Sequence, residues 1–525
     1  MKKFCALAII LALTGTTFFL VEGCKPKNAP AASGEIKSAE KNSFNEVTSK
    51  LDPGGSFYLY LSTEQWLNNL SSKIGNLHQV VSSLPDVRDQ QQDIDHAFTV
   101  VTKLVKESGL EQISGLGMSS IAREPGFYHN KLIVHHYSGQ GNGFIWKIFG
   151  KEPHELTGLD LLPANTAMAM FYDLDASQVW SIIEKECDES GFPQAKDSLD
   201  RFRREFAQGA HMKWEDAVDS LGGEFGIVVT LDPSHMITVP LPTQEPLDIP
   251  EPGIMLVVKV KNDAIFSRID AELAKNAGKQ VISEDKDGVK MRTVPVPIPL
   301  VSLRPSIAVS GGYLFIATSD ALIREALAVK GGKPGLKSTD EFKKLADGLP
   351  TQGNQFCFLS QRFGQTVVKI QQQALQMHQD APPQVKELLK SFLNPDQAAF
   401  TFAVGANTDE GWMTVANGNQ GSGNVLAASA VVPAMLAAVA LPGFAKARET
   451  SQKNQCINNL RIIDAAKQQW ALENNKKETD VPTWDDLRPF LGRAKMPLHC
   501  GKGGEYTIGP VGEKPTCSIP GHELR

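Results

Sequence analysis

The chain has 525 residues, of which 42% are hydrophobic and 21% charged, and its formal net charge is -6. This length exceeds what one hydrophobic core usually organises, so several domains are expected. The composition is that of an ordinary folded protein, and the net negative charge argues against a protein that coats nucleic acid.

The N-terminal residues have the pattern of a signal peptide. Two lysines precede an uncharged apolar run from Phe4 to Val21, an order of regions that is typical of exported proteins. The run ends in Glu22-Gly23-Cys24, which resembles a bacterial lipobox, although glutamate departs from the small or apolar residue usual at that place. The resemblance implies a signal peptide over residues 1–23 and lipidation of Cys24, with simple cleavage or an uncleaved anchor as the alternatives. Residues 24–50 have few large apolar side chains, and we interpret them as a flexible tether.

The middle of the chain repeats one pattern. Each copy begins with a proline, continues through an apolar strand and enters an amphipathic helix. Ser62 with Gln65, and again Asp175 with Gln178, have the spacing of a helix capping box. The copies begin at Pro53, Pro163, Pro252 and Pro350, with strands predicted at 57–61, 167–172, 255–260 and 356–359.

Pairs of alternating strands lie between these copies, separated by turns such as Asp287-Gly288. We therefore predict an α+β fold in which repeated strand-helix-hairpin units form antiparallel sheets, with domains at 51–250 and 251–420. The pattern, including Gly312-Tyr-Leu-Phe-Ile-Ala-Thr-Ser and the helix predicted after it, resembles an uncharacterised family of exported bacterial repeat proteins. That resemblance covers about 51–420 and implies no activity.

The body offers few candidates for catalysis. His135 and His136 are adjacent in a predicted strand, so their side chains would point to opposite faces and would not share one metal ion. Asp173 and Asp175 are candidates for an acid pair at a strand end, but a capping role explains Asp175 without catalysis. The sequence contains no His-Glu-x-x-His motif, phosphate-binding loop, nucleophile elbow or dinucleotide fingerprint. We predict no catalytic residues and no cofactor.

The C-terminal part begins with an apolar stretch. From Val425 to Phe444 the chain is uncharged and rich in alanine, which is long enough to cross a bilayer. Alanine and two prolines weaken a transmembrane assignment, and a soluble apolar helix is the alternative. Because apolar residues continue at helical spacing beyond it, we predict one long helix from Val425 to about Asn474.

Several phrases of this part resemble a known class of protein. They are Leu441-Pro-Gly-Phe-Ala-Lys-Ala-Arg-Glu, Cys456-Ile-Asn-Asn-Leu, Gln469-Trp-Ala-Leu-Glu and Pro515-Thr-Cys-Ser-Ile-Pro-Gly-His. They are similar to type II secretion pseudopilins and type IV pilin-like proteins, in which a long membrane helix continues into a small head. The resemblance covers about 434–524 and implies a pseudopilin-like module at 424–525, with a long helix and a small β head. A prepilin opens with a processing site and a following glutamate, whereas this helix is internal and has neither.

Two cysteines flank the Gly-rich segment near the C-terminus. We predict a disulfide between Cys500 and Cys517, because a covalent link strongly stabilises a small head and an outward-facing head would be oxidised. The alternative is a metal site in which Cys500, Cys517 and His522 bind zinc, with His499 as a further candidate. Basic residues follow the apolar stretch, so the positive-inside rule would place the head in the cytoplasm. A cytoplasmic head favours the metal site.

These features predict an exported, membrane-anchored protein of the cell envelope with its body in the periplasm. We expect a binding or scaffolding role rather than an enzyme, associated through the C-terminal module with a secretion system or pilus. The expected partners are membrane lipid and other pilin-like or envelope proteins, and not nucleic acid. The alternative is an exported hydrolase with scattered active-site residues, of which Asp173 and Asp175 are the first candidates.

Overall fold

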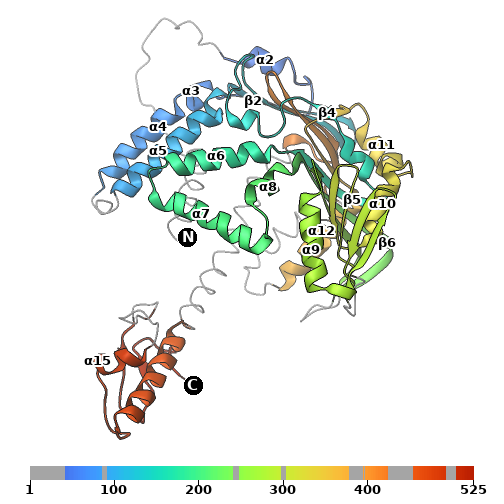
Figure 1. The fold of residues 1–525 in the computed structure, drawn as a ribbon. Coiled ribbons are helices and arrows are strands. Elements are labelled where there is room, and N and C mark those ends of the chain that lie inside the picture. The colour runs from blue at the N-terminus through green and yellow to red at the C-terminus, as the bar shows by residue number, and fades with distance from the viewer. Residues whose placement is uncertain are drawn as a thin grey trace, which may run out of the picture. The chain divides into compact units, whose positions relative to one another are not determined.

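A computed structural model describes residues 42–84, 91–239, 247–296, 303–377, 394, 397–423, 453, 455–491, 500 and 504–524 (Figure 1). The chain divides into two compact units, a body that extends to Leu426 and a C-terminal unit from Ala427 to Arg525. The predicted signal peptide, the lipidation site Cys24, the apolar stretch at 425–444 and His499 lie outside the described residues.

One antiparallel sheet runs through the body. Within the described residues it has thirteen strands in the order β1-β2-β3-β15-β14-β13-β5-β6-β7-β11-β10-β9-β8. The predicted α+β fold with antiparallel sheets is therefore confirmed. The predicted domain boundary at residue 250 falls inside β7, so both predicted body domains share this sheet. The strands are β1 (Phe57–Ser62), β2 (Gly115–Glu124), β3 (Phe127–His135), β5 (Thr166–Asp173), β6 (Leu221–Val239), β7 (Leu247–Val260), β8 (Ile282–Lys286), β9 (Val289–Thr293), β10 (Ser306–Ser310), β11 (Tyr313–Ala317), β13 (Gln355–Leu359), β14 (Thr401–Thr408) and β15 (Gly411–Gly418), with a separate short pair of β4 (His154–Glu155) and β12 (Gln352–Gly353).

The predicted repeat is present, because a strand and then a helix follow Pro53, Pro163 and Pro350, and Pro252 lies inside the strand that leads into its helix. β1, β5, β7 and β13 lead respectively into α3, α6, α9 and α12. In three of the units the chain then returns as a hairpin beside its own first strand, which gives β1-β2-β3, β5-β6-β7 and β13-β14-β15. The third unit differs, because its last strand β11 pairs with β7. The helices of the body are α2 (Phe44–Thr48), α3 (Glu64–Leu67), α4 (Leu70–Ser82), α5 (Gln91–Ser108), α6 (Ala176–Glu189), α7 (Pro193–Ala210), α8 (Trp214–Asp219), α9 (Ala264–Asn276), α10 (Asp320–Lys330), α11 (Asp340–Ala346) and α12 (Gln361–Met377), with 3-10 turns η2 (Leu110–Gln112), η3 (Phe144–Trp146), η4 (Thr157–Leu161), η5 (Gly278–Gln280) and η6 (Leu336–Ser338).

One face of the sheet holds the main core of the body. Side chains alternate between the two faces along each strand, and those on this face are largely buried. α10 and α11 lie over it (Figure 1), and together with η4 they contribute apolar side chains to the same cluster. The cluster includes Phe171, Val257, Phe315, Phe356 and Val404 from the strands, and Leu161, Ile323, Phe342 and Leu345 from the covering elements.

The C-terminal unit is built on a helix that spans 455–473. Ile463, Ala466 and Trp470 on one side of this helix are buried against α15 (Trp484–Leu487), a 3-10 turn η8 (Arg488–Phe490) and the region of the hairpin formed by β16 (Tyr506–Thr507) and β17 (Thr516–Cys517). The first half of the predicted 425–474 helix lies outside the described residues. The pilin-like character of this unit therefore stays a prediction.

The predicted transmembrane helix is wrong for the part of the chain that the structure describes. No helix among those residues is both long enough and apolar enough to span a bilayer. The helix at 455–473 shows the physical reason, because Arg461, Asp464 and Lys467 interrupt its apolar positions. The stretch at 425–444, on which the prediction was based, lies outside the described residues.

Candidate functional site

The predicted acid pair has two separate roles. Asp175 caps α6, and its carboxylate accepts a hydrogen bond from the backbone N–H of Gln178 at 2.9 Å. Asp173 instead accepts hydrogen bonds from His154 Nε2 at 2.9 Å and from Asn354 Nδ2 at 3.0 Å. The capping prediction is confirmed for Asp175, and the two carboxylates have different partners. The predicted cap at Ser62 is wrong, because Ser62 ends β1 and α3 begins after Thr63, which makes no side-chain capping hydrogen bond.

His154 is a residue that sequence analysis missed, because it lies far from Asp173 in the chain. Its Nε2 contacts Asp173, and its Nδ1 lies 2.8 Å from the carbonyl oxygen of Glu155. Burial alone would lower the pKa of His154, but the hydrogen bonds to Glu155 and Asp173 outweigh it, and the pKa is raised. Both ring nitrogens are engaged, so this histidine is poorly placed to activate a nucleophile.

The two adjacent histidines also have separate partners. His135 is fully buried, its Nδ1 lies 2.6 Å from Ser114 Oγ, and burial lowers its pKa. His136 packs edge-on against Trp146, and its Nδ1 lies 2.9 Å from the carbonyl oxygen of Tyr137. The two rings therefore do not share a site, and His135 Nε2 is buried without a hydrogen-bond partner in the described part of the chain.

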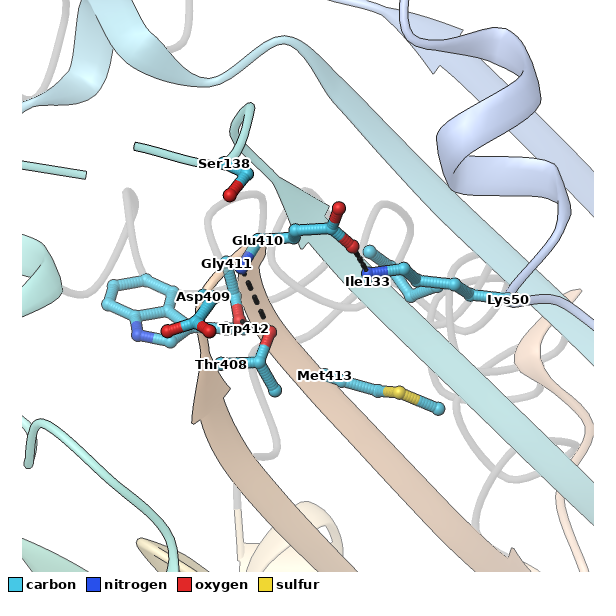
Figure 2. A pocket seen from close by; sticks show the side chains of 9 residues that line it. All are labelled: Lys50, Ile133, Ser138, Thr408, Asp409, Glu410, Gly411, Trp412 and Met413. Carbon is cyan, nitrogen blue, oxygen red and sulfur yellow. Dashed lines mark hydrogen bonds and ion pairs between the residues drawn. The ribbon is translucent and has the colours of Figure 1, made fainter. Parts of the chain in front are cut away.

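An open cavity of about 550 Å³ lies beside the turn between β14 and β15 (Figure 2). Glu410 in this turn forms an ion pair with Lys50, which holds the pKa of the carboxyl below its usual range. Figure 2 shows the two side chains meeting across the cavity, with Ser138 and Asp409 nearby. The Glu410 carboxylate is therefore already paired with a cation, which makes it poorly placed to act as a catalytic acid or base.

The face of the sheet opposite the core carries an exposed line of apolar side chains. Met170, Ile227, Leu256 and Ile316 are direct cross-strand partners on β5, β6, β7 and β11. Met170 and Leu256 are each 42% exposed and Ile316 is 38% exposed, whereas Ile227 is half-buried. We call these four residues the apolar row. Ile254, two residues before Leu256 on the same face, is also exposed.

Helices cover only part of this face. α9 packs on its β7-β10-β11 end, where Phe266 joins Leu314 in a separate apolar cluster, and α12 contacts β5 (Figure 1). An almost wholly apolar cavity of about 280 Å³ lies among α7, α8, α9 and Leu221 of β6. Leu221 pairs with Val260, which lies on the same face as Leu256, so the cavity and the apolar row open on one side of the sheet.

The C-terminal unit contains a cluster of four metal-binding side chains. Cys456 on the helix at 455–473, Cys500, Cys517 on β17, and His522 place their ligand atoms within 4.8 Å of one another. Cys456, Cys500 and His522 are buried. Sequence analysis named three of these residues and missed Cys456. Its helical position resembles an ordinary core position.

No disulfide joins Cys456, Cys500 or Cys517 within the residues that the structure describes. The disulfide predicted between Cys500 and Cys517 stays a prediction, with metal binding as its alternative. Burial raises the pKa of the Cys456 thiol to about 12.

Comparison with curated proteins finds no match, and comparison with solved structures finds none either. A family model described as a protein of unknown function, DUF3352, matches residues 147–409. The matched segment runs from the residues just before β4 to the end of β14, and it contains the apolar row and the apolar cavity. Because the match covers half of the 525 residues, the chain belongs to the DUF3352 family.

Proposed function

We propose that this protein is a non-catalytic binding protein of the cell envelope, and that its body takes the hydrocarbon chain of a lipid on the open face of the sheet. The apolar row carries the proposal. An antiparallel sheet with one solvated face normally alternates apolar and polar residues. Here the outward positions of four neighbouring strands are Met170, Ile227, Leu256 and Ile316, and contiguous exposed apolar surface of this kind marks an interaction site.

The apolar cavity on the same side favours a hydrocarbon chain over a peptide or a sugar. Its lining is apolar apart from Arg268, and a polar ligand would lose hydrogen bonds to water there without replacing them. The guanidinium of Arg268 donates to the carbonyl of Ala210 and pairs with Glu272. An alkyl chain needs no partners of that kind.

A fluorescent long-chain fatty acid tests the proposal on the purified full chain. The variant Met170→Gln with Leu256→Gln removes two apolar contacts, each worth about 1 to 2 kcal/mol, so affinity should fall at least tenfold. The matched control is Val80→Gln on α4, which changes a side chain that is 60% exposed and lies outside the sheet. Binding that is absent from the wild type, or that falls equally in the control, would refute the proposal.

The partners of the acidic side chains support a non-catalytic role. The hydrolase candidates Asp173 and Asp175 are held by a histidine and by a helix end, and Glu410 is neutralised by Lys50. These are the roles of structural side chains. Association with a secretion system or pilus rests on sequence resemblance alone and stays a prediction.

The envelope location rests on the N-terminal sequence, where the apolar run from Phe4 to Val21 is followed by Glu22-Gly23-Cys24. Intact mass measurement of the detergent-extracted protein is the direct test. We expect the mass of a chain that begins at an acylated Cys24, and a Cys24→Ala variant should be released from the membrane fraction. An unmodified cysteine in a fractionated soluble protein would refute this location.

A further inference from the structure

We propose that Cys456, Cys500, Cys517 and His522 form a structural zinc site that holds the C-terminal unit together. This inference goes beyond the binding role of the body, because it concerns a separate unit. Zinc binds thiolate at about 2.3 Å and imidazole nitrogen at about 2.0 Å, which places tetrahedral donors about 3.6 to 3.8 Å apart. Cys500 Sγ and His522 Nδ1 are 3.4 Å apart, and all four ligand atoms fall within 4.8 Å.

The donor set selects the metal. Three sulfurs and one imidazole are soft and borderline donors that suit zinc, whereas calcium and magnesium take oxygen ligands. Four protein side chains complete a tetrahedron and leave no position for water or substrate, which is the arrangement of a structural site. Leu460, Tyr506, Ile519 and Leu524 pack around the cluster, and three of its four side chains, Cys456, Cys500 and His522, are buried.

The backbone packs closely around the Cys517 sulfur. The N–H of Ile519 points to Cys517 Sγ at 3.5 Å, and the N–H of His522 donates to the carbonyl of Ile519, which turns the chain back toward the sulfur. Gly521 in this turn has φ of 79°, which favours glycine. Gly504 passes so close that a Cβ there would lie 2.8 Å from Cys517 Sγ.

A metal ion at this point would add a direct link between the helix at 455–473 and the hairpin region. Its hairpin consists of two strands of two residues each, β16 and β17. Cys456 comes from the helix at 455–473, whereas Cys517 and His522 come from the hairpin and the turn that follows it. Small domains with short strands commonly depend on such a link, and the free energy of zinc binding then contributes directly to folding.

Cys456 and His522 decide between zinc and a disulfide. A Cys500–Cys517 disulfide would use two of the four side chains. It would leave Cys456 and His522 buried with their polar atoms directed at the same point and without a function. Zinc uses all four.

The test measures zinc and thiol state on the full chain, purified without chelators. We expect one zinc ion per chain in the wild type, and at least a tenfold lower zinc content in Cys456→Ser and in His522→Gln. The matched controls are Cys187→Ser and Cys357→Ser, which alter free thiols outside the cluster and should keep the full zinc content.

Three results would overturn the proposal. The first is a zinc-free chain in which Cys500 and Cys517 resist alkylation until they are reduced. The second is a zinc-free chain in which all three cysteines of the cluster react with the alkylating reagent. The third is a full zinc content in both ligand variants. Exchange of the wild type with Co²⁺ keeps the test decisive if the variants fail to fold. Tetrahedral thiolate ligation gives visible ligand-field bands and a sulfur-to-cobalt charge-transfer band, and their absence from the exchanged wild type would also overturn the proposal.

Discussion

Phe171→Ala should strongly destabilise the body. Phe171 is 2% exposed, and its ring stacks on Phe356 with centroids 4.9 Å apart. Gly226 faces it across the strands and Gly158 lies over it, and an added Cβ at either glycine would come within 2.5 Å of the ring. Neighbours without side chains cannot collapse into the space left by the ring. We therefore expect a loss near the upper end of the range for such truncations, about 4 to 5 kcal/mol.

Met170→Ala is the matched control, because Met170 precedes Phe171 on β5 and points to the opposite face. It is 42% exposed, so its truncation should cost less than about 1 kcal/mol. Denaturant unfolding of the full chain, followed by far-ultraviolet circular dichroism, gives both values. Similar costs for the two variants would show that the division into a core face and an open face is incorrect.

Three further variants test local features. Asp175→Ala removes the cap of α6 and should cost about 1 kcal/mol, measured by denaturant unfolding. Burial acts to lower the pKa of His154, but its hydrogen bonds to a carbonyl and to Asp173 raise this pKa overall. The protonated histidine therefore stabilises the folded protein fully at pH values below its pKa in the unfolded chain. This stabilisation is lost as the pH rises through its pKa in the folded protein. Unfolding free energy should thus fall less between about pH 6 and pH 8 in His154→Asn than in the wild type, and equal slopes would contradict this reasoning. Lys467 is fully buried and donates to two backbone carbonyls at 2.8 and 2.6 Å, so Lys467→Ala should destabilise the C-terminal unit by about 3 kcal/mol, measured by hydrogen exchange, with an unchanged body as the internal control.

The sequence was sufficient to predict the repeated units, because their signals are local. A proline, an apolar run and the start of a helix lie within a dozen or so neighbouring positions, and each predicted copy contains a strand followed by a helix. The order of the units in the sheet was not predictable in this way. β3 pairs with β15, and β13 with β5, between segments that are far apart in the chain. Such pairings depend on tertiary packing and leave no local pattern.

The residues of the candidate sites were likewise predictable only where they lie close together in the sequence. Cys517 and His522 lie close in sequence and were recognised as possible ligands, whereas Cys456 comes from a helix in which cysteine is also an ordinary buried residue. Asp173 was recognised as a carboxylate at a strand end, but its partner His154 belongs to β4. Convergence of distant segments creates both groupings.

The open face of the sheet follows from where the helices of the body come in the chain. α10, α11 and η4 lie in the connections between units, and they cover the core face. α9 and α12 instead follow the first strands of their own units, and each covers only part of the opposite face. The apolar row crosses strands that belong to two different units, so neither unit supplies a helix dedicated to it. If these positions were only solvated, polar residues would serve the fold equally well. Four apolar side chains in cross-strand register therefore favour a ligand that completes the second layer of the sheet.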